Sequence, residues 1–214
     1  MISFIVKGLL RDRSRSLQPF LIITFVVAIF IFFTGFIIGI YDSMFLNTAI
    51  VNSGHLKIVT EAYQKDNQML PNDLAITNSD SLMSSLELEY TDYNWTSRIT
   101  FGGLLDVPDD KGKTLAQTPV IGLGIDFLST VSLQSDLWKI DSKIIDGKNI
   151  NNINQILISR TLARKLNVNV NDNITFIGST MHGGLADGNL IVQGIFDLNL
   201  GPVARNMIIT DLKT

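Results

Sequence analysis

Cysteine is absent from this sequence of 214 residues, and histidine occurs only twice, as His55 and His182. The lack of cysteine excludes disulfides and thiolate metal ligands. The two histidines lie in unrelated contexts and do not have the helical spacing of a zinc-binding pair. We therefore expect no metal site. We expect His55 to begin a strand and His182 to lie exposed in a loop.

Motifs for catalysis and nucleotide binding are also missing. No serine lies in a G-x-S-x-G turn, and Gly122-Leu123-Gly124 is followed by neither a third glycine nor a Lys-Ser/Thr pair. The acids Asp109 and Asp110, like Glu87 and Glu89, lie in turn-like or exposed contexts, where solvated charges are expected. The sequence thus predicts that this chain is not an enzyme and binds no cofactor.

Charge is missing from one long segment. No charged residue lies between Arg15 and Asp42, and Leu17–Tyr41 is almost entirely apolar. As a helix rising about 1.5 Å per residue, this segment exceeds the roughly 30 Å hydrocarbon core of a bilayer. A cleaved signal peptide is the alternative, but its apolar core is only about 7–15 residues long. Because Tyr41-Asp42-Ser43-Met44 offers no small-residue cleavage site, we expect an uncleaved transmembrane helix at 17–41.

The charges that flank this helix predict its orientation. The residues before it include four basic residues and one acidic residue, whereas the region from Asp42 onward has 13 basic and 19 acidic residues. Positive residues near a span stay in the cytoplasm, so we expect residues 1–16 inside and 42–214 outside the membrane. The acidic outer region argues against a nucleic-acid partner. The cytoplasmic segment 1–16 has the periodicity of an amphipathic helix, through Ile2, Ile5, Val6, Leu9 and Leu10.

Within the apolar helix, Gly35 and Gly39 form a G-x-x-x-G pattern. Small residues at this spacing allow a second helix to approach closely. Glycine is also common in membrane helices without such a role. The sequence leaves both interpretations open.

The region 42–214 is long enough for one sizeable domain and has the pattern of an α+β fold. Ser79–Leu88 is predicted to be a helix capped by Ser79 or Asp80, and Ser159 to cap a second helix that buries Leu162, Ala163 and Leu166. Asn167–Asp172 is expected to form a turn, and the glycine-rich Gly178–Asn189 a loop. Strands are predicted at His55–Thr60, Arg98–Leu105, Thr118–Ile125, Gln155–Ile158, Asn173–Ile177, Leu190–Leu198 and Asn206–Thr210.

Several motifs follow one another in an order typical of one family. Ser53-Gly54-His55-Leu56-Lys57-Ile58 comes directly after the apolar helix, and Ile145-Asp146-Gly147 follows later. The longest motif is Ile156-Leu157-Ile158-Ser159-x-x-Leu162-Ala163-x-x-Leu166-Asn167-Val168-x-Val170-x-Asp172-x-Ile174, and Val192-x-Gly194-Ile195-Phe196 comes last. With the basic start and the first span, this order resembles the permease subunits of ABC transporters of the lipoprotein-releasing and macrolide-exporter type. The resemblance implies one transmembrane helix followed by the outer core domain of such permeases.

The sequence also departs from this family. The family usually has glycine at the positions of Asn167 and Asn171, where asparagine can adopt the same left-handed backbone. It also has three further spans after the outer domain, whereas this sequence ends at Thr214. We therefore expect the sequence to represent part of a permease.

The resemblance implies that this chain acts together with partner subunits and that the chemical step takes place on one of those partners. A separate cytoplasmic subunit would bind and hydrolyse ATP, and a second permease subunit, identical or different, would complete the complex in the membrane lipids. In the lipoprotein-releasing branch, a lipid-anchored protein is passed to a soluble carrier. The loop between the two late strands can carry a carrier-docking hook, here Gly178–Asn189 with Met181, His182 and Leu185 as contact residues.

The glycine content of this loop favours a plain flexible connection over a hook. The alternative function of the whole chain is that of a single-span anchored sensor or scaffold with a ligand-binding outer domain.

Overall fold

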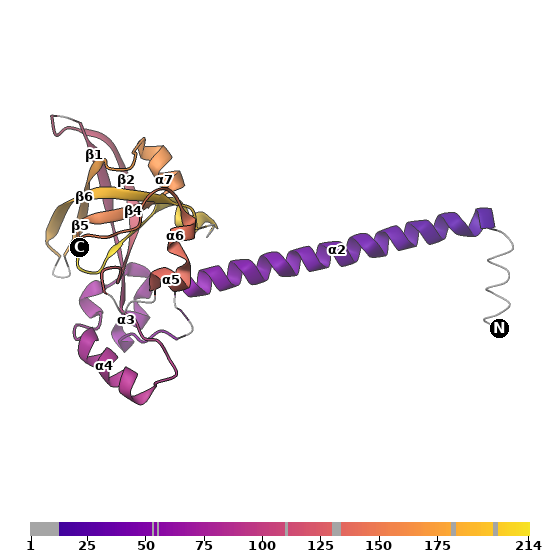
Figure 1. The fold of residues 1–214 in the computed structure, drawn as a ribbon, viewed down its shortest axis with the longest axis horizontal. Coiled ribbons are helices and arrows are strands. Elements are labelled where there is room, and N and C mark those ends of the chain that lie inside the picture. Colours follow the sequence, from indigo (N-terminus) through magenta and orange to yellow (C-terminus); the bar gives the residue numbers. More distant parts are fainter. Residues whose placement is uncertain are drawn as a thin grey trace. The chain divides into compact units, whose positions relative to one another are not determined.

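The computed structural model describes residues 13–52, 54, 56–109, 111–129, 134–180, 183–198 and 201–214 (Figure 1). The chain forms two compact units, Met1–Asn52 and Ser53–Thr214, which we describe separately. Of the predicted amphipathic segment 1–16, residues 1–12 lie outside the described residues.

The described part of the first unit is a long helix, α2, from Arg13 to Asn52. Its segment Leu17–Tyr41 is long and apolar enough to cross a membrane, and its side chains are exposed throughout. The Thr34 hydroxyl donates to the Phe30 carbonyl at 2.8 Å, so this polar group is satisfied within the helix itself. The predicted helix is therefore present, and it continues to Asn52 instead of ending at Tyr41.

The second unit begins with short helical segments and then alternates strands with helices. The elements before the first strand are α3 (Glu61–Lys65), η1 (Asn67–Met69), η2 (Asn72–Leu74) and α4 (Ser79–Glu89). Two long strands follow, β1 (Arg98–Pro108) and β2 (Thr114–Ile125). The remaining elements are α5 (Gln134–Trp138), α6 (Ile140–Lys143), β3 (Ile144–Gly147), β4 (Gln155–Ser159), α7 (Arg160–Leu166), β5 (Asn173–Ser179), β6 (Leu185–Phe196), η3 (Gly201–Asn206) and β7 (Met207–Asp211).

Six of these strands close into a barrel. Hydrogen bonds connect them in the order β6-β4-β7-β2-β1-β5, and β5 pairs with β6 to complete the ring, while β3 is an additional strand beside β6. The pairs β2–β7 and β4–β6 are parallel, and the other pairs are antiparallel. Closing the ring leaves fewer open strand edges than a flat sheet would. The second unit is thus a mixed helix and strand fold, as predicted, organised around a six-stranded barrel.

The barrel strands and helix α7 share one apolar core. Ser159 caps α7, because its Oγ accepts from Leu162 N at 3.3 Å and donates to the Arg205 carbonyl at 2.9 Å. Asn167 and Asn171 have φ angles of 54° and 74°, the left-handed backbone expected of asparagine in this turn. The predicted cap, buried face and turn are therefore confirmed. The core consists of Leu105, Val120, Ile156, Ile158, Leu162, Ala163, Leu166, Val168, Ile174, Leu190, Val192 and Ile208.

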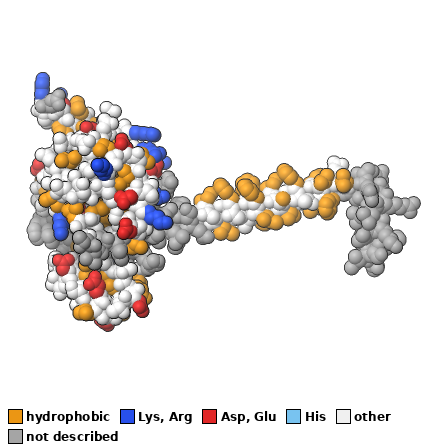
Figure 2. Space-filling view, viewed as in Figure 1, with side chains coloured by type: hydrophobic (Ala, Val, Ile, Leu, Met, Phe, Trp, Pro, Cys, Tyr) orange, Lys and Arg blue, Asp and Glu red, His pale blue; other side chains and the backbone are white. Residues whose placement is uncertain are grey.

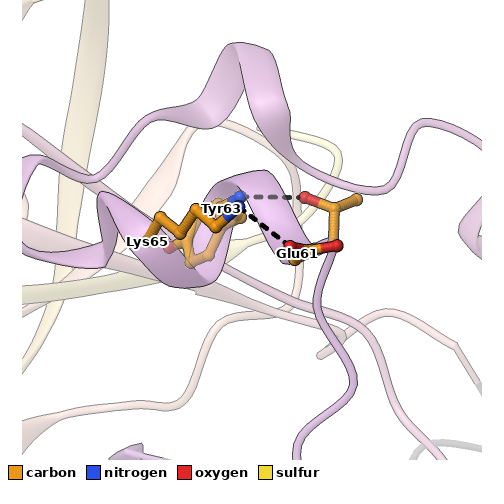
Figure 3. Close-up of polar contacts among 4 residues, drawn as sticks. Glu61, Tyr63 and Lys65 are labelled. Atoms are coloured by element: carbon orange, nitrogen blue, oxygen red, sulfur yellow. Dashed lines mark hydrogen bonds and ion pairs between the residues drawn. The ribbon is translucent and has the colours of Figure 1, made fainter.

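The predicted strand at His55–Thr60 is wrong for the described residues 56–60, which have an irregular backbone. Leu56 and Ile58 are 60% and 45% exposed, so this stretch lacks the buried face that a strand needs. Its last residue, Thr60, instead caps α3, since Tyr63 N donates to Thr60 Oγ1 at 3.0 Å (Figure 3). Lys65 then pairs with a carboxylate oxygen of Glu61 one turn away, at 2.8 Å.

Other boundaries differ by a few residues. Strands β1 and β2 run further than predicted and leave a shorter turn, in which Asp109 Oδ1 accepts from Lys111 N and Lys113 N. The predicted helix α4 is confirmed, but Asn78 occupies its N-cap position instead of Ser79 or Asp80. Strand β3 was not predicted from the sequence, because four residues carry too little periodicity.

Candidate functional site

The hairpin of β5 and β6 contains the predicted partner-contact loop. Seven residue pairs join the two strands, from Asn173↔Ile191 to Ser179↔Leu185. At the turn, Thr180 N donates to the Gly184 carbonyl at 2.7 Å, and Gly184 N donates to Thr180 Oγ1 at 3.0 Å. The turn between the strands is therefore stabilised by hydrogen bonds at its own ends.

The prediction that Gly178–Asn189 forms a loop is wrong for most of its length. Gly178, Ser179 and residues 185–189 pair as strands instead. Strand pairing uses backbone groups, so glycine residues can take part in it. Gly178 also leaves room for the Phe176 ring, because a Cβ at Gly178 would lie 2.7 Å from Cε1 of Phe176. The connection is thus a short turn at the end of a paired hairpin, not a long flexible loop.

Leu185 is the described member of the three predicted contact residues, and Met181 and His182 lie outside the described residues. The Leu185 side chain is 89% exposed, directly beside the turn. Among the described residues, 185–190 of β6 pair with β5 on one side and with no strand on the other, because β4 begins to pair at Ile191. An exposed apolar side chain next to an open strand edge is favourable for protein contacts. The contact itself stays a prediction.

The two candidate packing residues, Gly35 and Gly39, lie on α2. Among the described residues, no atom outside the helix lies within 4 Å of a Cβ built at either glycine. Both positions are therefore open to a neighbouring helix, and the role of Gly35 and Gly39 in helix packing stays a prediction.

A groove of about 260 Å³ lies between α7 and β3. Arg160 Nη1 lies 3.0 Å from Asp197 Oδ2, and both side chains are partly exposed. The lining contains two guanidinium groups, Arg160 and Arg164, and one carboxylate, Asp146, and the ion pair with Asp197 offsets part of the positive charge of Arg160. Its lining residues are Ile145, Asp146, Arg160, Ala163, Arg164, Asn167, Val168, Asn169 and Ile195.

A cation–π contact connects β1 with α5. Cζ of Arg98 lies 4.8 Å from the centre of the Trp138 ring, and Trp138 is only 6% exposed. Burial lowers the pKa of Arg98 from its ordinary value, but a guanidinium stays charged at neutral pH. This contact therefore joins the start of β1 to α5 and supplies no titrating group for catalysis.

Side chains that could act as metal ligands are dispersed over the described residues. Within the described part of the chain, no three His, Cys, Asp or Glu side chains lie close enough together to hold a metal ion. Exposed side chains of the β5–β6 hairpin and the α7 groove are surface features on which a contact could form.

In comparisons with known proteins, no family model matches this sequence and no curated protein matches it. The functional assignment therefore depends on the sequence motifs and on the geometry of the two units.

Sequence reasoning missed the α7 groove and the Arg98–Trp138 contact. The groove joins residues of β3 and α7 with Ile195 of β6, and these elements are distant in the sequence. Arg98 and Trp138 are forty positions apart in the sequence, so no local spacing could indicate their contact. Such features require the order of strands in the barrel, which local patterns do not contain.

Proposed function

We propose that this chain is a permease subunit of an ABC transporter of the lipoprotein-releasing or macrolide-exporter type. In this proposal α2 anchors the chain in a bacterial cell membrane, with the barrel unit outside the cell membrane. A cytoplasmic partner hydrolyses ATP, and the barrel unit moves against a second permease subunit. The chain itself performs no chemical step.

The observation that carries this proposal is the ordered set of motifs that follows the apolar helix. In the folded chain, three motif segments that are separate in the sequence are neighbours on β6. Gly147 of β3 pairs with Gly194, and on the other side of the strand Ile158 of β4 pairs with Ile195. The motifs therefore describe one structural element, which supports a common origin better than isolated matches would.

The hairpin of β5 and β6 supports the lipoprotein-releasing branch in particular. It presents the exposed Leu185 beside its turn, at the place where that branch carries its docking hook. We propose that this turn contacts a soluble carrier of lipid-anchored proteins. Apolar anchors on a paired hairpin lose little conformational entropy when they bind, which favours such a role.

The orientation of the chain can be tested directly, because the sequence contains no cysteine. We expect a membrane-impermeant maleimide to label Lys111→Cys, in the turn between β1 and β2, in spheroplasts. Ser14→Cys should be labelled only after the membrane is opened, because positive flanks remain in the cytoplasm. The cysteine-free chain is the control. Labelling of Ser14→Cys alone, or a mature chain lacking 17–41, would contradict the proposed topology.

The transporter function is tested by purification of the full chain in mild detergent. We expect an ATP-binding subunit and a second membrane subunit to co-purify, with ATPase activity that vanadate inhibits. Cells carrying the untagged chain provide the control. A chain that purifies as a single membrane protein, without ATPase activity, would instead favour the anchored sensor or scaffold.

A further inference from the structure

The acidic residues of the second unit are unevenly distributed. Residues 66–97 contain six acidic residues and no lysine or arginine, whereas the remainder of 53–214 has 13 basic and 12 acidic residues. The segment has a net charge of −6 and the remainder +1, so the net negative charge of the unit lies entirely in this one segment. We call residues 66–97, which contain η1, η2 and α4, the α4 lobe. The view in Figure 2 shows acidic and apolar side chains on this lobe, without lysine or arginine among them.

The α4 lobe also exposes large apolar side chains. All eleven residues of α4 are described, and none of them is buried. Leu88 is 84% exposed, and the aromatic residues that follow, Tyr90 and Tyr93, are 45% and 51% exposed. Exposed apolar side chains that gather in one place mark interaction surfaces more often than isolated ones do.

The aromatic side chains of the lobe are held in place. The Trp95 ring lies 6.3 Å from Tyr90 and 5.9 Å from Tyr93, measured between ring centres. The Ser97 hydroxyl lies 3.1 Å from the Met83 sulfur, so the segment leading into β1 packs on α4. Tyrosine and tryptophan held in this way are frequent anchors of protein interfaces, because little side-chain entropy remains to be lost.

The charge of the lobe decides which kind of partner fits this surface. Anionic lipid headgroups and nucleic acids would be repelled, since the lobe contains no basic residue to meet a phosphate. The Glu89 carboxylate adjoins the Tyr90 phenol in the sequence, and its negative charge raises the pKa of that phenol. Charge complementarity therefore favours a partner that surrounds apolar side chains with lysine or arginine.

We propose that the α4 lobe docks a basic amphipathic segment of another protein. The apolar side of that segment covers Leu88, Tyr90 and Tyr93, and its basic residues face Glu87, Glu89 and Asp92. This surface is independent of the β5–β6 hairpin and of the ATP-hydrolysing subunit. It would thus add a second docking site to the outer unit.

The proposal is tested with the full chain in nanodiscs of zwitterionic lipid. The probe is an 18-residue helical peptide of leucine and lysine, with a leucine and glutamate peptide of the same pattern as its control. We expect the lysine peptide to bind, and its Kd to rise several-fold between 50 and about 300 mM salt, because salt screens exposed charges. The glutamate peptide and empty nanodiscs should show no binding.

Two sets of variants locate the site. The lobe variant Glu87→Lys, Glu89→Lys, Asp92→Lys should weaken binding by about ten-fold or more. The control variant Gln117→Lys, Asp136→Lys, Asp141→Lys, Asn151→Lys raises the net charge by the same six units at exposed positions outside the lobe, the hairpin and the groove, and it should change the Kd less than about two-fold. Equal losses in both variants would overturn the proposal, because binding would then follow net charge alone.

The apolar part of the surface needs its own variant. Leu88→Ser with Tyr93→Ser should also weaken binding by several-fold while the lobe keeps its charge. If this variant bound the lysine peptide unchanged, the proposal of a docking surface would be wrong, because the peptide would then be held by charge attraction alone. Circular dichroism and the melting temperature of each variant establish that the unit is folded. A protein partner would also be contradicted if the full chain bound vesicles of anionic lipid more strongly than it bound the lysine peptide.

Discussion

Leu162→Ala should lower the free energy of unfolding of the second unit by about 3 kcal/mol. Leu162 is completely buried in the core that α7 shares with the barrel. Truncation removes the transfer free energy of its side chain and leaves a cavity, and neighbours on strands held in a closed ring cannot move far to fill it. The loss should appear as a lower midpoint of denaturation.

Tryptophan fluorescence of the full chain in detergent provides the measurement. Both tryptophans of the sequence, Trp95 and Trp138, lie in the second unit, so the signal does not report on α2. Leu115→Ala is the matched control, because Leu115 is 70% exposed and the same truncation there should cost less than about 0.5 kcal/mol. Equal stability losses in the two variants would show that α7 does not share the core.

Gly147→Ala should destabilise the second unit by more than about 2 kcal/mol, through strain instead of a cavity. Gly147 has a φ of 82°, a left-handed conformation that costs an alanine free energy. A Cβ there would press against the Gln193 carbonyl and lie 2.8 Å from Gly194 Cα. Both obstacles are backbone atoms of β6, which pairs with β4 on its other side and cannot move independently.

The matched control is Gly102→Ala, since no described atom lies within 4 Å of a Cβ at Gly102. Its φ also lies outside the left-handed range. We expect its stability to change by less than about 1 kcal/mol, measured by the same fluorescence. A Gly147→Ala protein as stable as Gly102→Ala would contradict the close packing of β3 on β6.

Local chemistry made α7 predictable from the sequence. A serine followed by apolar residues at helical spacing, and then by asparagine, specifies the cap, the buried face and the end of a helix within about ten residues. The cap and the end depend on contacts between close neighbours in the sequence, such as Leu162 N with Ser159 Oγ. The buried face follows from the helical spacing of Leu162, Ala163 and Leu166, which the barrel core then covers. The packing of α7 in the folded unit agrees with these local preferences.

Features that depend on long-range pairing could not be predicted in the same way. The glycine-rich stretch 178–189 lacks strand propensity, but pairing with Asn173–Ser179 extends the hairpin through it. Residues 56–60 have strand propensity but gain no partner among the described strands. In both cases the availability of a neighbouring strand, which no local pattern records, decided the outcome.

The position of the candidate site in the sequence could be predicted, but its strand pairing could not. The sequence indicated the segment between the two late strands as a contact region, and the structure places Leu185 there with 89% of its side chain exposed. No pattern in the sequence indicated the open strand edge at residues 185–190. This edge is open because β4 pairs with β6 only from Ile191 onward. That edge depends on how a strand is shared between two neighbours.

Strand β6 pairs with β5 along its first half and with β4 along its second, and Ile191 pairs with both. Twelve residues of one strand, about 40 Å of extended backbone, thus run from the tip that bears Leu185 to the segment beside β3. The register with β4 shifts at Val192–Gly194, so the strand is irregular where it passes from one neighbour to the other. The strand that bears Leu185 at its start also supplies Ile195 to the α7 groove, so molecules bound at the tip and in the groove would contact one continuous strand.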